Sequence, residues 1–168
     1  DGRAEVTWKA ADGKGTTVTQ YVVRWSGGST TVDAPATSAD ITGLENGTSY
    51  RFTVEARNGF ADDGGISKPS AESNAVTPYT RPAQPTVSGS NGKCTSSSKC
   101  PVTVRASAGG SDGGGGGKTL QVRVDGGEWT SSGTSFSKTY QVTSGGKVTI
   151  EARVKNAEGL VSGTVSKT

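Results

Sequence analysis

Histidine and methionine are both absent from this 168-residue sequence. Without His, the chain lacks the usual general base near neutral pH and the commonest metal ligand. No cofactor motif is complete, so we predict that the chain is not an enzyme and carries no cofactor or metal. Neither an initiator Met nor a signal peptide opens the sequence, and we interpret the chain as an internal piece of a longer protein.

Runs of one charge and long apolar runs are also lacking. Acidic and basic residues are interspersed and the net charge is only +3, so we expect no nucleic-acid partner. No stretch approaches the roughly 18 consecutive apolar residues that a membrane-spanning helix needs. We therefore expect no membrane insertion by this fragment.

Cysteine is scarce, and the only two residues of this type are Cys94 and Cys100. Two cysteines without His cannot complete a four-ligand zinc site, and their spacing is not the C-x-x-C of a redox pair. We interpret them as a disulfide that closes a small loop, with two unpaired thiols as the alternative. A disulfide would place the chain in an oxidising compartment, outside the cell.

Glycine, in contrast, is abundant at 26 residues, and apolar residues alternate with polar ones along most of the chain. Alternation is the period of a β-strand, and Gly-rich turn signals separate the alternating runs. No segment keeps a helical period over three turns, so the sequence predicts an all-β protein. The inward-facing residues of three early runs are expected to be Ala4, Val6 and Trp8; Tyr21, Val23 and Trp25; and Tyr50, Phe52, Val54 and Ala56.

A proline-rich stretch at 77–85, "TPYTRPAQP", predicts a domain boundary because proline cannot join a central strand. The alternating pattern restarts after it, and "LENGTSYRFTVEARN" aligns with "VTSGGKVTIEARVKN" at a constant offset. This internal repeat places Tyr50 opposite Val148 and Asn58 opposite Asn156. We predict one domain at 1–80 and a second at 81–168.

The first half closely resembles a fibronectin type III domain. The signature residues are Trp8, Tyr21, and the pair Leu44 and Tyr50 in "LENGTSY". The resemblance implies a tyrosine corner, in which the Tyr50 hydroxyl binds nearby backbone, and a last strand that begins at Gly65. It also implies that the first strand of the domain is missing.

The second half resembles the family more weakly, because Ala106 and Val148 replace the tryptophan and the corner tyrosine. The implied fold is two tandem immunoglobulin-like or fibronectin type III β-sandwiches, the second degenerate. We expect the Cys94–Cys100 disulfide to offset part of the lost corner.

The stretch "SDGGGGGKT", residues 111–119, ends like a phosphate-binding loop. Such a loop needs a glycine where Asp112 stands and a helix after Thr119, whereas "LQVRV" reads as a strand. We therefore expect a flexible loop between two strands and no nucleotide site.

Loop aromatic and acidic residues supply the candidate ligand-binding positions. Asp62 and Asp63 could hold a calcium ion with backbone carbonyls, but two acids alone rarely bind calcium well, and a solvated acidic loop is the favoured interpretation. Phe60 interrupts a polar loop, where it could anchor a protein contact or fold back over the sandwich. Trp129 invites the same two interpretations, with packing against its hairpin favoured.

Arginine rows are predicted on the outer face of one sheet in each half. The first row contains Arg24, Arg51 and Arg57, and its counterpart contains Arg123, Arg153 and Lys155. A solvated ladder of mixed charge or a docking face for an acidic protein or glycan would both fit. We include Arg57 among the candidate binding residues.

The resemblance implies extracellular, non-enzymatic recognition. The chain is similar to paired fibronectin type III domains of surface proteins from high-GC Gram-positive bacteria, some of which engage host proteins. We expect a protein partner, such as a host cytokine, bound through loops or the elbow between the domains, and polysaccharide is a further candidate ligand. The alternative is a rigid spacer in a secreted polysaccharide-degrading enzyme.

Overall fold

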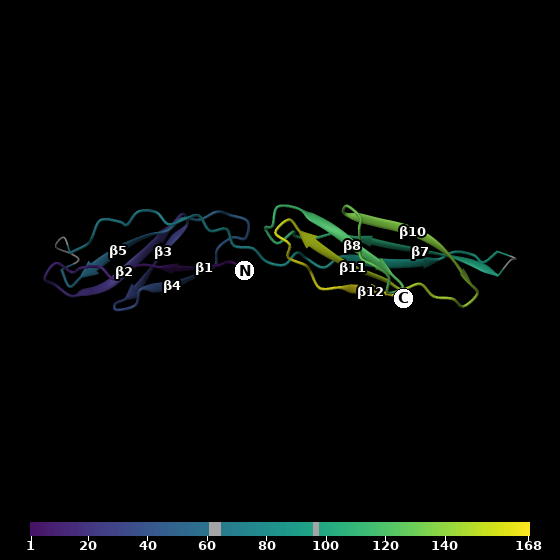
Figure 1. Cartoon of the computed structure of the whole chain (residues 1–168), viewed down its shortest axis with the longest axis horizontal. Coiled ribbons are helices and arrows are strands. Elements are labelled where there is room, and N and C mark those ends of the chain that lie inside the picture. Colours follow the sequence, from purple (N-terminus) through teal and green to yellow (C-terminus); the bar gives the residue numbers. More distant parts are fainter. Residues whose placement is uncertain (61–64, 96–97) are drawn as a thin grey trace. The chain divides into compact units, whose positions relative to one another are not determined.

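A computed structural model describes residues 1–60, 65–95 and 98–168. Every regular element in these ranges is a β-strand, which confirms the all-β prediction (Figure 1). The chain divides into two compact units, Asp1–Pro78 and Tyr79–Thr168. Each unit is a sandwich of two antiparallel sheets, so the fold class is that of tandem β-sandwiches.

The first unit pairs β1 with β4 in one sheet and orders β3-β2-β5 in the other. Tyr21 of β2 lies opposite Val32 of β3 and Ala56 of β5, so the predicted inward positions share one face. The strand bounds are β1 Arg3–Thr7, β2 Val18–Trp25, β3 Gly28–Asp33, β4 Ser38–Thr42 and β5 Thr53–Asn58.

The core of the first unit fills the space between these sheets, because successive strand residues point to opposite faces. Its buried members are Ala4, Val6, Val23, Ile41, Leu44, Tyr50 and Phe52. Trp8 and Trp25 pack against this cluster while partly exposed. The Trp8 ring also lies 5.3 Å from that of Tyr21, which is itself buried.

The second unit orders β10-β7-β6 in one sheet and β12-β11-β8-β9 in the other. A strand, β8, follows the Gly-rich loop where a nucleotide-binding fold would place a helix. The strand bounds are β6 Thr86–Asn91, β7 Lys99–Ser107, β8 Lys118–Val124, β9 Thr130–Ser131, β10 Ser135–Thr143, β11 Ile150–Asn156 and β12 Val165–Lys167.

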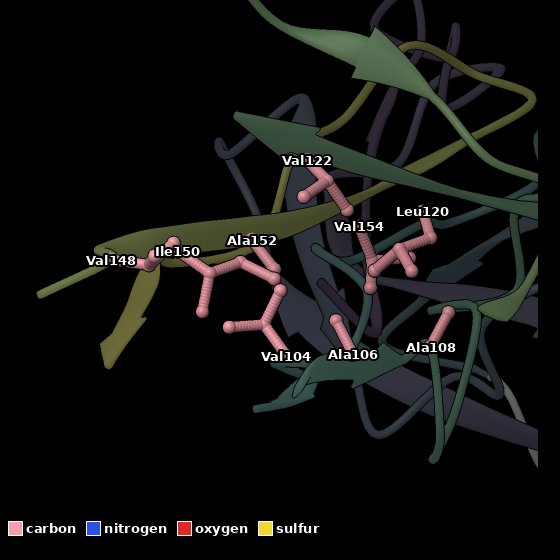
Figure 2. Close-up of a cluster of buried hydrophobic side chains, with 9 residues drawn as sticks. All are labelled: Val104, Ala106, Ala108, Leu120, Val122, Val148, Ile150, Ala152 and Val154. Atoms are coloured by element: carbon pink, nitrogen blue, oxygen red, sulfur yellow. The ribbon is translucent and has the colours of Figure 1, made fainter. Parts of the chain in front are cut away.

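The core of the second unit is aliphatic. Figure 2 shows Ile150 of β11 and Val104 of β7 directed toward one another across the sandwich. Leu120, Ile150 and Val154 are each 0% exposed. The remaining buried members of the cluster are Ala106, Ala108, Val122, Val148 and Ala152.

A tyrosine hydroxyl fixes the turn before β5 in the first unit. The Tyr50 side chain is buried, and its hydroxyl oxygen accepts a hydrogen bond of 3.0 Å from the backbone N–H of Glu45. This is the geometry that the family resemblance implies for the corner. The position aligned with Tyr50 in the second unit is Val148, which is equally buried but has no polar atom to offer.

The segment after Gly65 corrects the expectation of a last strand. Instead of a continuous ladder, every third residue is a serine that makes two bonds to the backbone of β5 or of Phe52, the residue just before it. The N–H of Ser70 donates to the carbonyl of Val54, and the Ser70 hydroxyl accepts from the Val54 N–H at 3.0 Å. Ser67 and Ser73 make the same pair of bonds to Ala56 and Phe52.

A spacing of three residues is the period of polyproline II conformation, in which the other two residues of each turn face away from β5. The serine hydroxyls supply the acceptors that a strand backbone would otherwise present. Ser162 repeats the arrangement in the second unit, where it exchanges the same two bonds with Val154 of β11. Both sandwiches therefore use serine bonds of this kind, to β5 in the first unit and to β11 in the second, and they also share the pattern of inward-facing residues.

A disulfide joins Cys94 and Cys100, as predicted. It ties the segment after β6 to the start of β7, and their Cα atoms are 4.1 Å apart. Cys100 is largely buried at the end of the sheet. The bond therefore closes a short loop next to the core of the second unit.

Candidate functional site

The end of the first unit that carries Phe60 presents exposed apolar surface. Phe60 is 61% exposed and Ile66 is 45% exposed, and they are the exposed large hydrophobic residues among those described. Phe60 therefore does not fold back over the sandwich. An aromatic side chain that remains in water after folding can bury its area only against a partner.

The backbone around Phe60 is held by Asn58, the last residue of β5. The Asn58 side-chain oxygen accepts from the Phe60 N–H at 2.9 Å, and its amide donates to the Thr16 hydroxyl at 2.8 Å. The Phe60 carbonyl in turn accepts from the N–H of Gly65 at 2.8 Å. The Phe60 ring is therefore exposed, while hydrogen bonds hold the backbone that carries it.

A groove of about 240 Å³ has Ile66, one member of this apolar pair, in its lining. The connection between β1 and β2 forms one wall through Asp12 and Lys14, and Arg57 and Ile66 line the other. Asp12 and Lys14 form an ion pair of 3.0 Å. The Lys14 backbone N–H, followed by its ammonium group, lowers the pKa of Asp12 below its usual value.

Arg57 contributes an unsatisfied donor to this end of the unit. Its Nε atom is buried and has no hydrogen-bond partner among the described residues. Buried donors normally find an acceptor, so the Arg57 Nε is an exception to this rule. The structure thus brings Arg57 and Phe60, two of the predicted binding residues, to the same end. Asp62 and Asp63, predicted for the same loop, lie outside the described residues.

Trp129 lies in the second unit and packs on the outer face of its four-stranded sheet. The ring centroid is 4.8 Å from the guanidinium carbon of Arg123 and 4.2 Å from that of Arg153. Arg123 also binds Glu151 through two hydrogen bonds of 2.7 and 2.9 Å. These bonds raise the pKa of Arg123 and lower that of Glu151.

These arginine side chains therefore bind within the unit. The Arg153 Nε donates to the Gln121 side chain at 2.9 Å. In the first unit, Arg24 pairs with Glu55 at 3.2 Å, and Arg51 donates to the carbonyl of Ser73 at 2.8 Å. Internal partners therefore occupy four members of the two rows, Arg24, Arg51, Arg123 and Arg153, whereas the Arg57 Nε has none.

The Gly-rich loop at 109–117 corrects a second expectation, because it is held in place rather than slack. The Asp112 carboxylate accepts from the N–H groups of Gly114 and Gly117 at 2.9 and 3.1 Å. These two bonds hold the pKa of Asp112 below its ordinary value of 3.8. The Asp112 carboxylate therefore accepts from two of the loop N–H groups that a phosphate would otherwise bind.

The same loop is fixed to the start of the second unit. The N–H of Thr80 donates to the carbonyl of Gly113 at 2.9 Å. The Asn156 side chain donates to the carbonyl of Asp112 at 3.1 Å. A Cβ at Gly113 would lie 2.2 Å from the Thr80 oxygen, and one at Gly115 would lie 2.2 Å from the Asn156 amide nitrogen. Glycine is therefore required here for close approach rather than for mobility.

Sequence reasoning missed the roles of two asparagines and of the serine series. Asn58 and Asn156 occupy matching positions of the repeat. Each accepts a hydrogen bond from the loop that follows its strand, and Asn156 also donates to the Gly-rich loop. The repeat was visible in the sequence, as was the three-residue spacing of Ser67, Ser70 and Ser73. The partners of the serines were not visible, because they lie 11 to 21 residues away in the chain, and neither was the bond from Asn156 to Asp112, 44 residues away.

No group of three or more His, Cys, Asp or Glu side chains within 1–60, 65–95 and 98–168 could hold a metal ion. In the same ranges, no helix has the length and apolar character required to cross a membrane.

Comparison with known proteins finds a similarity that is confined to the first unit. Residues 1–75, less than half of the chain, match the model of the fibronectin type III domain. Among solved structures, the FN1–FN3 domains of chicken CNTN1 are 16% identical, with a TM-score of 0.44 over 99% of this chain and 61% of that one. A two-domain fibronectin type III segment of chicken tenascin is also 16% identical, with a TM-score of 0.46 over 99% of this chain and 90% of that one. No curated protein sequence matches the chain.

Proposed function

We propose that this chain is a non-enzymatic recognition module of an extracellular bacterial surface protein, and that it binds a partner protein through the end of the first unit. The exposure of Phe60 carries the proposal. Fibronectin type III domains are generally non-catalytic modules used for binding or spacing, and the disulfide suggests an extracellular context.

The chemistry of this end favours a protein partner. Aromatic and arginine side chains are enriched among the residues that contribute most to protein interfaces, and Phe60 and Arg57 are of these types. Ile66 extends the apolar area, and the Asp12–Lys14 pair lies at the groove beside it. A host protein such as a cytokine is the partner class that we propose.

The test measures binding of the whole chain to a panel of purified host cytokines on a biosensor surface. A binder in the panel should lose affinity by about tenfold or more with Phe60→Ala, because truncating an anchor at the centre of an interface removes at least 1.4 kcal/mol. Thr31→Ala, at an exposed position of β3 in the same unit, is the matched control and should leave affinity unchanged.

Folding must be intact for this comparison. Phe60 is exposed, so we expect the unfolding curves of Phe60→Ala and wild type to differ by less than about 0.5 kcal/mol. Unchanged affinity of Phe60→Ala for a confirmed binder would remove this end from the site. If no protein in the panel binds, the proposed partner class is wrong, and a spacer role becomes the better description.

A further inference from the structure

The outer face of the β10-β7-β6 sheet has an arginine surrounded by hydroxyl groups. Val104 and Ala106 are buried on the inner face, so Arg105 between them points outward. The strand register places Ser137 of β10 on one side of Arg105 and Ser88 of β6 on the other. The face continues with Thr86, Ser90, Thr103, Ser107, Ser135 and Thr139.

No carboxylate lies in this sheet, because β6, β7 and β10 contain neither Asp nor Glu. Arg105 is exposed, and within the described ranges its side chain forms no ion pair, hydrogen bond or ring contact. This distinguishes it from Arg123 and Arg153 on the other sheet of the unit, which bind Glu151, Gln121 and Trp129. Arg105 therefore keeps its five donor positions for a ligand.

A depression of about 310 Å³ opens over this part of the sheet. Arg105, Ser88, Ser137 and the half-buried Phe136 are among the residues that line it. Nearby, the Thr103 and Thr139 hydroxyls share a hydrogen bond of 2.8 Å, which orients one oxygen of the pair toward the other. The serine hydroxyls around Arg105 have no comparable side-chain partner on the face, in the residues that the structure describes.

We propose that this face binds a saccharide that carries carboxylate groups. A guanidinium pairs with a carboxylate through two parallel hydrogen bonds. Serine and threonine hydroxyls both donate and accept hydrogen bonds, and so do sugar hydroxyls. Each protein hydroxyl can therefore act as donor or acceptor toward a sugar hydroxyl. The absence of acidic residues removes repulsion toward an anionic chain.

An acidic protein partner fits the face less well. Protein interfaces depend on large apolar anchors, and the exposed large hydrophobic residues in the described ranges, Phe60 and Ile66, belong to the first unit. Hydroxyl groups and one free guanidinium match a hydrated, anionic sugar better. The inference is independent of the proposed function, since it concerns a different unit and a different ligand.

The experiment titrates the whole chain with hexagalacturonate by calorimetry at low salt. A neutral hexasaccharide and poly-glutamate of similar length serve as comparison ligands. We expect binding of hexagalacturonate that weakens as salt rises, because the contact is ionic and exposed. Arg105→Gln should reduce affinity by about tenfold or more, since it removes a charge-assisted bidentate pair.

Arg81→Gln is the matched control, because Arg81 is an exposed arginine elsewhere in the same unit. It should change affinity by less than about twofold, as should Phe60→Ala, if the two binding surfaces are separate. The proposal fails if hexagalacturonate does not bind or if Arg105→Gln binds it as well as wild type does. Equally tight binding of poly-glutamate would also overturn it, by showing that charge alone is recognised.

Discussion

The two sandwiches of this chain are built on the same inward rows but fill them with different side chains. In the first unit, Tyr50 and Phe52 are buried at 7% and 2% exposure. Their counterparts in the second unit, Val148 and Ile150, are buried at 6% and 0%. Alternation of apolar and polar residues thus specifies which positions are buried, while the chemistry of the buried side chain can change from aromatic to aliphatic.

The units also differ in how they hold their turns. The first uses the Tyr50 hydroxyl to satisfy the Glu45 N–H. The second cannot do so with Val148. It contains instead the Cys94–Cys100 disulfide and the loop held by Asp112. The first unit thus has a polar contact at its tyrosine corner, whereas the second has a covalent link and a hydrogen-bonded loop, and three experiments test how far this contrast extends.

Truncation of the aromatic core should have the largest effect. Tyr50→Ala removes a buried ring and the corner hydrogen bond, and we expect a loss of about 4 kcal/mol, in the range for deletion of a buried aromatic ring. Urea unfolding of the whole chain, combined with amide exchange resolved for each unit, measures the change and shows where it occurs. Exchange in the second unit should stay protected.

Two control variants separate the contribution of the Tyr50 hydroxyl from that of its ring and compare the two units. Tyr50→Phe keeps the ring and removes only the hydroxyl acceptor, so it should cost about 1 kcal/mol. Val148→Ala, at the matching position of the second unit, should cost less than Tyr50→Ala because a smaller side chain is lost. If Val148→Ala proved the more damaging change, the aromatic core would not be what stabilises the first unit.

Loss of the disulfide should have an intermediate effect that is confined to the second unit. Replacement of both Cys94 and Cys100 by serine removes the closure of a short loop, which we expect to cost about 2 kcal/mol on the chain-entropy model. Thermal unfolding measures this loss, and addition of a reductant to wild type should reproduce it. A double variant as stable as wild type would show that the disulfide does not replace the missing corner.

Acidification should have the smallest effect. The Gly114 and Gly117 amides keep the pKa of Asp112 below 3.8 in the folded state. The unfolded chain therefore takes up this proton first, and the stabilisation from Asp112 is lost as the pH falls from about 5 through the folded pKa. Melting temperatures of wild type and Asp112→Asn, measured between pH 7 and pH 3, should converge on acidification.

Glu151 is a second carboxyl in this unit with a lowered pKa, so wild type also loses stability through the Arg123–Glu151 pair at low pH. The difference between wild type and Asp112→Asn isolates the loop, because both proteins keep that pair. A constant difference across the pH range would contradict the role assigned to Asp112.

Some parts of this architecture could be predicted from the sequence and others could not. The inward rows, the disulfide and the strand after Thr119 could all be predicted from local pattern, since each depends on spacing along the chain. The sequence around the serine series predicts a strand, because the partners of the serines at Phe52, Val54 and Ala56 are not local. The exposure of Phe60 was also undecided, because a loop sequence does not reveal whether its aromatic residue folds back.

What the sequence determined by itself is the alternation that builds two sandwiches, since side-chain direction in a strand changes at every residue. The tertiary structure decided which polar groups remain free to bind. Asp112 and Asn156 are 44 residues apart, yet their bond helps turn a run of glycines into a fixed loop. Arg105 and Arg123 look alike in the sequence, but only the fold supplies Arg123 with Glu151 and leaves Arg105 open, because pairing across strands depends on register.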